Sequence, residues 1–134
     1  MKYYQIRDQR EAKVSELIKE CRMFFAFSDS QLKEGMTENP LDEGDKYVSI
    51  GAGGYMPKSN VEKYTNGCEE IDKWYNGIIK ENNMDDEVIL YELANHEAFY
   101  TGEIEDTYYA LGCNYTKEKI WEIYNKNYHK YADC

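Results

Sequence analysis

The densest polar chemistry in the sequence surrounds His96. Glu92 and His96 stand four residues apart, so on a helix both side chains would lie on one face and could bind one divalent ion. The metalloprotease pattern His-Glu-x-x-His is not met, because Tyr100 stands where the second histidine belongs. Three interpretations stay open: a metal-assisted enzyme at Glu92, His96 and Glu97, a binding role for Asn95 and His96, or hydrogen bonds that cap the following turn.

A glycine-rich stretch lies between an expected strand and an expected helix, the order found in loops that hold phosphate. It fits neither named phosphate motif, because Met56 stands at the third glycine of G-x-G-x-x-G and Pro57 precedes the lysine of a would-be P-loop. A plain turn or β-bulge with positive φ is one interpretation, and contact with a nucleotide-like ligand is the other. Candidate ligand-binding residues are Gly51, Gly53, Gly54, Tyr55, Lys58 and Ser59, together with Asn95 and His96.

The acidic residues are concentrated in one quarter of the chain. Residues 81–116 contain nine Asp and Glu and no Lys or Arg, whereas the other 98 residues carry 17 acids and 16 bases. Some of these acids can support helix N-termini, which favour negative charge, and the rest can form a solvated face. The alternative is a negative patch that docks on a basic protein surface. The candidate partner-binding residues are Asp85, Asp86, Glu87, Glu103, Glu105 and Asp106.

Composition limits the class of protein. The chain has 134 residues, 42% of them hydrophobic, a length typical of one domain with its own core. A net charge of −10 argues against direct binding of nucleic acid, and no apolar run is long enough to span a membrane. The first residues lack the apolar stretch of a signal peptide, so we expect a cytoplasmic protein whose cysteines are free thiols, with Cys134 exposed.

The hydrophobic periodicity predicts an α+β fold in which about five helices pack with a small antiparallel sheet of two or three strands. The apolar stretch 23–27 is predicted to form a buried strand that pairs with a second strand over 47–50. Ser59 and Glu62 form a capping box, and Gly67 marks a possible break in the helix that follows. The expected helices cover residues 10–21, a short segment ending at 36, 59–81, 86–100, 103–111 and a final segment capped by Thr116.

The sequence also resembles a known group of proteins. The resemblance rests on residues 24–28, 49–55, 92–97, 100–102, 106–107 and 110–112, and it covers most of the chain. The group is a family of small uncharacterised proteins encoded by phages, prophages and other mobile elements of bacteria. The resemblance supplies no catalytic residues and no cofactor. It implies an accessory role, with counter-defence among the expected ones.

Two further hypotheses compete with the metal-assisted enzyme. The first is a non-enzymatic, acidic inhibitor of phage type that binds a basic site on a host defence protein, with tyrosine and tryptophan anchors supplying most of the affinity. The second is a binder or sponge for a nucleotide-like signalling molecule at residues 51–59. The net charge favours the inhibitor, because an anionic ligand would approach against a negative field.

Overall fold

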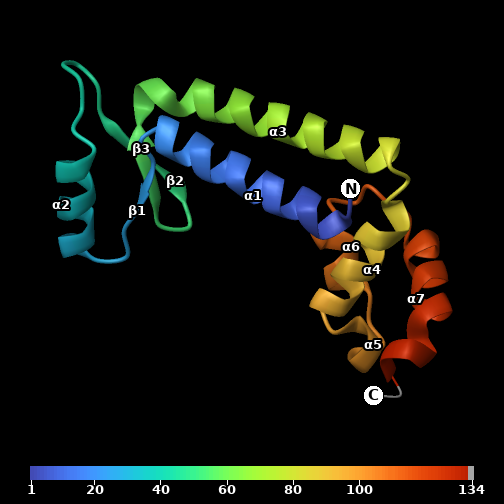
Figure 1. Cartoon of the computed structure of the whole chain (residues 1–134). Coiled ribbons are helices and arrows are strands. Elements are labelled where there is room, and N and C mark those ends of the chain that lie inside the picture. Colours follow the sequence, from blue (N-terminus) through green and yellow to red (C-terminus); the bar gives the residue numbers. More distant parts are fainter. Residues whose placement is uncertain (133–134) are drawn as a thin grey trace. The chain divides into compact units, whose positions relative to one another are not determined.

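The computed structural model describes residues 1–132, in which seven α-helices accompany one three-stranded antiparallel sheet (Figure 1). This arrangement confirms the α+β class. The chain divides into two compact units, an N-terminal unit (Lys2–Gly77) and a C-terminal unit (Ile78–Cys134, with Met1). Two compact units can belong to one domain, so the single domain over residues 1–134 stays a prediction. Cys134, which was expected to be exposed, lies outside the described residues.

Two long antiparallel helices, α1 and α3, pack side by side in the N-terminal unit. The Tyr3 and Tyr75 hydroxyl groups lie 2.8 Å apart, and the Arg10 guanidinium lies 3.0 Å from the Asp72 carboxylate. Arg10 also stacks over the Tyr75 ring at 4.3 Å. The elements of this unit are α1 (Tyr3–Glu20), β1 (Phe24–Phe25), α2 (Asp29–Glu38), β2 (Tyr47–Gly51), β3 (Gly54–Pro57), a 3-10 turn (Lys58–Asn60) and most of α3 (Val61–Glu81), whose last four residues belong to the C-terminal unit.

The sequence left open a helix break near Gly67, but none occurs there, and α3 runs through that position. A Cβ atom on Gly67 would lie 2.5 Å from Cδ1 of Leu17, which is closer than real Cβ atoms approach their neighbours. The missing side chain therefore lets α1 and α3 approach each other closely at this point. That packing compensates for the low helix propensity of glycine.

The sheet differs from the expected pairing. Its strand order is β1-β3-β2, so the expected pairing of residues 23–27 with 47–50 is wrong, because the unforeseen strand β3 lies between them. A two-residue turn joins β2 to β3, with φ of 51° at Ala52 and 79° at Gly53. Positive φ at both positions is the mark of a type I′ hairpin, whose twist matches that of the strands. A register shift between Ser49 and Gly51 adds a bulge next to the turn.

The stretch 23–27 is only partly the buried strand that its composition suggested. The Phe24 ring packs against α2, so closely that a Cβ atom added to Gly35 would lie 2.2 Å from the ring. The Phe24 ring also stacks on the Tyr55 ring, with 5.8 Å between their centres. Phe25 and Phe27, by contrast, are 51% and 77% exposed. Because β1 is a short edge strand with alternating faces, one side of it is left without a covering element.

The C-terminal unit is helical, and α4 contacts each of its other helices. Its core contains the buried side chains of Ile89, Leu93, Ile104, Ile120 and Ile123. The single helix expected over 86–100 is wrong, because Glu97 adopts a left-handed backbone conformation (φ 56°) that ends one helix before the next begins. The helices are α4 (Asp85–Asn95), α5 (Ala98–Thr101), α6 (Glu105–Ala110) and α7 (Lys117–Ala132).

Aromatic stacking joins α5 to α7 in this unit. The Phe99 ring stacks on Tyr124 at 5.1 Å and on Tyr131 at 4.7 Å, with the rings within about 11° of parallel. The N-terminus of α7 is capped as expected, because the Thr116 hydroxyl oxygen accepts a hydrogen bond from the Lys119 N–H at 3.0 Å. The segment between them includes α6, which packs on α4.

Candidate functional site

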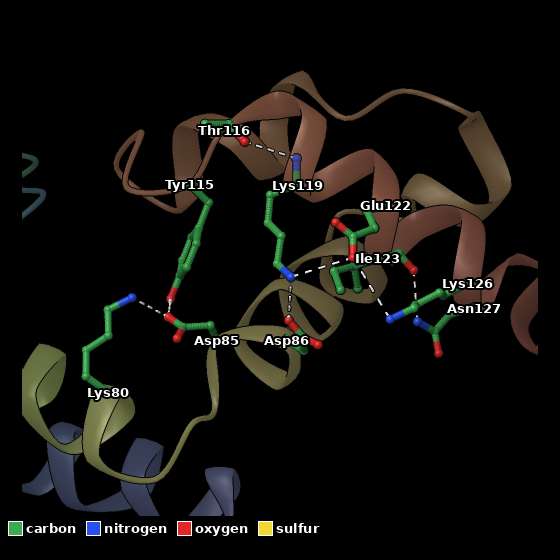
Figure 2. Close-up of polar contacts among 10 residues, drawn as sticks. All are labelled: Lys80, Asp85, Asp86, Tyr115, Thr116, Lys119, Glu122, Ile123, Lys126 and Asn127. Atoms are coloured by element: carbon green, nitrogen blue, oxygen red, sulfur yellow. Dashed lines mark hydrogen bonds and ion pairs between the residues drawn. The ribbon is translucent and has the colours of Figure 1, made fainter.

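The first two predicted partner-binding acids are occupied within the protein. The Asp85 carboxylate accepts hydrogen bonds from the Lys80 ammonium at 2.7 Å and from the Tyr115 hydroxyl at 2.5 Å (Figure 2). Asp86 forms an ion pair with Lys119 at 3.1 Å. These contacts link the start of α4 to the end of α3, to Tyr115 and to α7, so Asp85 and Asp86 hold local structure together.

The titration behaviour of this cluster agrees with its geometry. Partial burial of Asp85 tends to raise its pKa, but the hydrogen bonds from Lys80 and Tyr115 outweigh that effect and leave the pKa lowered. The hydrogen bond to Asp86 raises the pKa of Lys119. Both groups are therefore held in their charged forms, which is expected for a structural ion-pair network.

The acids near α6 have a different environment. Glu103, Glu105 and Asp106 are exposed, and no Lys or Arg among the described residues lies within 4 Å of their carboxylates. Two strongly exposed tyrosines flank them, Tyr100 at 92% and Tyr109 at 67%. We call residues 100–109 the acidic-tyrosine segment, after these five side chains. Sequence analysis predicted the three acids and expected tyrosine anchors in general, but it did not single out Tyr100 and Tyr109.

Buried residues hold this segment in position. Ile104 and Thr107 are almost completely buried, and the Thr107 hydroxyl donates to the Glu92 carbonyl oxygen at 3.4 Å. Gly102 ends α5 in a left-handed conformation (φ 76°), which turns the chain towards α6. The segment thus presents most of its side chains to solvent, while Ile104 and Thr107 anchor its backbone. Glu87, the remaining predicted acid, is exposed in the first turn of α4.

The histidine region offers a pair of groups rather than a metal centre. His96 Nε2 lies 3.2 Å from a Glu92 carboxylate oxygen, as their spacing on α4 predicted. Glu97 is exposed and stands at the left-handed break that follows, and Asn95 is exposed at the end of α4. Within residues 1–132 no group of three His, Cys, Asp or Glu side chains is placed to hold a metal ion. The contact is sufficient to orient the imidazole at the end of the helix.

The glycine-rich stretch is brought together as a hairpin packed against apolar side chains. A Cβ on Gly53 would lie 2.4 Å from the Phe27 ring, and one on Gly54 would lie 2.8 Å from the Ile50 side chain. At Gly51, whose φ is 88°, an added Cβ atom would have no neighbouring atom within 4 Å. The glycines therefore serve a turn and close apolar packing, and Tyr55 is turned towards Phe24 in the sheet.

The donors expected to hold an anion already hold a carboxylate. The Ser59 hydroxyl donates to Asp45 at 2.6 Å and the Ser59 N–H does so at 3.2 Å, in place of the expected capping box with Glu62. The hydroxyl of Ser59 and the N–H of Lys46 lower the pKa of Asp45. Lys58 is exposed beside this contact. A phosphate would therefore have to compete with a carboxylate of the chain itself.

One further surface was not foreseen from the sequence. A groove of about 270 Å³ lies between α1 and α3, lined by residues that include Leu17, Ile71 and Trp74. The apolar series of α3 was visible in the sequence, but the periodicity alone did not show that part of it would stay accessible. None of the helices described by the structure is both long enough and apolar enough to cross a membrane.

Comparison with family models assigns the chain to a group. A model described as a family of unknown function, DUF7659, matches residues 6–130. The chain belongs to the DUF7659 family. No curated protein and no solved structure matches it. The DUF7659 match covers almost all of both compact units, including the sheet and every helix except the first three residues of α1 and the last two of α7.

Proposed function

We propose that this DUF7659 protein is a non-catalytic binding protein whose acidic-tyrosine segment docks on a basic site of another protein. One combination of side chains carries the proposal. Tyr100 and Tyr109 are 92% and 67% exposed. The three acids of the same segment are also exposed, and they have no cationic partner within 4 Å among the described residues. The acids would steer a basic partner, and the two rings would supply buried contact area.

The biological setting belongs to the same proposal. The resemblance to phage, prophage and mobile-element proteins favours a counter-defence role in the cytoplasm of a bacterial host. The partner would be a host defence protein, and its basic site would be the surface with which that protein engages nucleic acid or another anion. An acidic inhibitor would occupy that site by charge complementarity without binding nucleic acid itself.

The alternatives receive less support from the geometry. A sponge for a nucleotide-like molecule would need the Ser59 donors, which are engaged by Asp45. A metal-assisted enzyme would need a third ligand beside Glu92 and His96, and the described residues place none there. Neither site offers the enclosed, convergent polar groups that a small-ligand pocket or a catalytic centre requires.

The experiment is a quantitative capture from bacterial host lysate with matched variants. Tyr100→Ala/Tyr109→Ala removes the rings, Glu105→Lys/Asp106→Lys reverses two charges, and Glu34→Lys/Glu38→Lys makes the same charge change on α2 as a control. We expect one partner that wild type and the α2 control capture equally and that both segment variants lose. The proposal fails if the segment variants retain every captured protein, or if the α2 control loses the partner as well.

A further inference from the structure

The groove between α1 and α3 has an apolar floor. Leu17, Ile71 and Trp74 line it, and Gly67 leaves part of the α3 backbone without a side chain. Ile71 and Trp74 belong to the apolar stripe of α3, yet both are only half-buried. An amphipathic helix that keeps part of its apolar stripe accessible to solvent, as α3 does at Ile71 and Trp74, can accept another element on that face.

The rim of the groove is predominantly negative. Glu16 and Glu20 on α1 and Glu70 on α3 line it, all three are exposed, and the described residues include no Lys or Arg within 4 Å of their carboxylates. The one base that lines the groove, Lys13, stacks over the Trp74 ring at 4.7 Å. The groove thus combines an apolar floor with uncompensated negative charge.

We propose that this groove is a second docking site, which binds an amphipathic helix with a basic polar face from a partner protein. Apolar side chains spaced i, i+4 would lie on Leu17, Ile71 and Trp74, and Arg or Lys side chains beside them would meet the glutamates of the rim. A second copy of this chain fits less well, because it would bring the same glutamates and a net charge of −10 against each other. The site lies on the N-terminal unit and does not depend on the acidic-tyrosine segment.

Trp74 provides a direct reporter for this site. The chain has two tryptophans, so the Trp121→Phe variant leaves Trp74 as the only one. The probe is a synthetic peptide of about 18 residues, long enough to form a helix on binding, with leucines at helical spacing and arginines between them. The comparison peptide keeps the leucines and has glutamate in place of arginine. Both are titrated into the full-length Trp121→Phe protein while the Trp74 emission is recorded.

We expect the basic peptide to shift Trp74 emission to shorter wavelength with saturation at one peptide per chain, and the acidic peptide to produce no shift. Glu20→Lys/Glu70→Lys should weaken binding of the basic peptide by about 10-fold or more, whereas Glu34→Lys/Glu38→Lys on α2 should change it by less than about 2-fold. If the first double variant does not fold, Glu16→Gln/Glu70→Gln tests the same charges with a smaller change. An unchanged Trp74 emission, equal binding of the two peptides, or equal weakening by the rim and α2 variants would overturn the proposal.

Discussion

At the scale of single residues, the decisive distinction is between acids that are paired and acids that are not. Asp85 and Asp86 carry the same formal charge as Glu105 and Asp106, but Lys80 and Lys119 neutralise the first two. Both lysines lie outside the base-free stretch 81–116: Lys80 directly precedes it, and Lys119 follows it and is brought next to α4 by the fold. The sequence therefore predicted where negative charge accumulates, but it could not show which carboxylates remain available to a partner.

The Asp85 contacts predict a pH-dependent stability. A lowered pKa in the folded state means that Asp85 stabilises the fold above its unfolded pKa of about 3.9, and that this contribution is lost as the pH falls through the folded-state pKa. We expect Asp85→Asn to lower the free energy of unfolding by about 1 kcal/mol at neutral pH, a modest value because Lys80 is largely exposed. Urea unfolding of both proteins measures it.

The same comparison at a pH below the lowered folded-state pKa of Asp85 should show a much smaller difference between Asp85→Asn and wild type, because Asp85 is then largely protonated in both the folded and the unfolded chain. Glu87→Gln is the control, since Glu87 is exposed in the same helical turn and is expected to cost less at neutral pH. An equal destabilisation by Asp85→Asn at both pH values would show that its charge is not what matters.

At the scale of elements, the sequence predicted helices better than strands. The 3.6-residue periodicity located α3 and α7, the C-terminal part of α1, which begins at Tyr3 rather than at residue 10, and α4, which ends at Asn95 rather than at residue 100. The Thr116 cap is where the side-chain chemistry placed it. Strand β3 was missed because it begins inside the glycine-rich stretch. The position of that stretch, between an expected strand and an expected helix, also suggested a loop that holds phosphate. The exposed rings of Phe25 and Phe27 were missed because an apolar run does not reveal which of its faces is covered.

The β2–β3 hairpin offers a test of the turn interpretation. Ala52 adopts a positive φ, which is unfavourable for alanine, in a type I′ turn that prefers Asn-Gly. We expect Ala52→Asn to raise the free energy of unfolding by about 0.5–1 kcal/mol, because asparagine tolerates this conformation more readily. Thermal and urea unfolding would both record the gain. A loss of stability would mean that the turn has another geometry.

The two glycines of α3 should respond differently to the same substitution. Gly77 has nothing within 4 Å of a Cβ position, so Gly77→Ala should stabilise the helix by about 0.5–1 kcal/mol. At Gly67 the added methyl group would collide with the buried Leu17 side chain. The free energy of unfolding of the Gly67→Ala variant should therefore be about 1–3 kcal/mol lower than that of the Gly77→Ala variant. Equal effects at the two positions would contradict the close approach of α1 and α3.

At the scale of the whole molecule, the proposed recognition role depends on the net charge and on two negative surfaces. The chain carries −10 overall, and the acidic-tyrosine segment and the α1–α3 groove are both negative surfaces with exposed or half-buried aromatic rings. Such surfaces attract basic partners at long range and bind them by aromatic and aliphatic contact. Membership of the DUF7659 family, which has no known function, is compatible with this view and does not itself identify a partner.

The most direct test of the central claim is the association rate of the captured partner, measured at low and high ionic strength. Wild type should associate quickly at low salt and slow as salt screens the segment, whereas Glu105→Lys/Asp106→Lys should associate more slowly and depend less on salt. Thermal unfolding of the variant should remain close to wild type, because exposed acids near a helix N-terminus contribute only about 0.3–1 kcal/mol each. Identical rates and an identical salt dependence for the two proteins would contradict a docking role for the acidic-tyrosine segment.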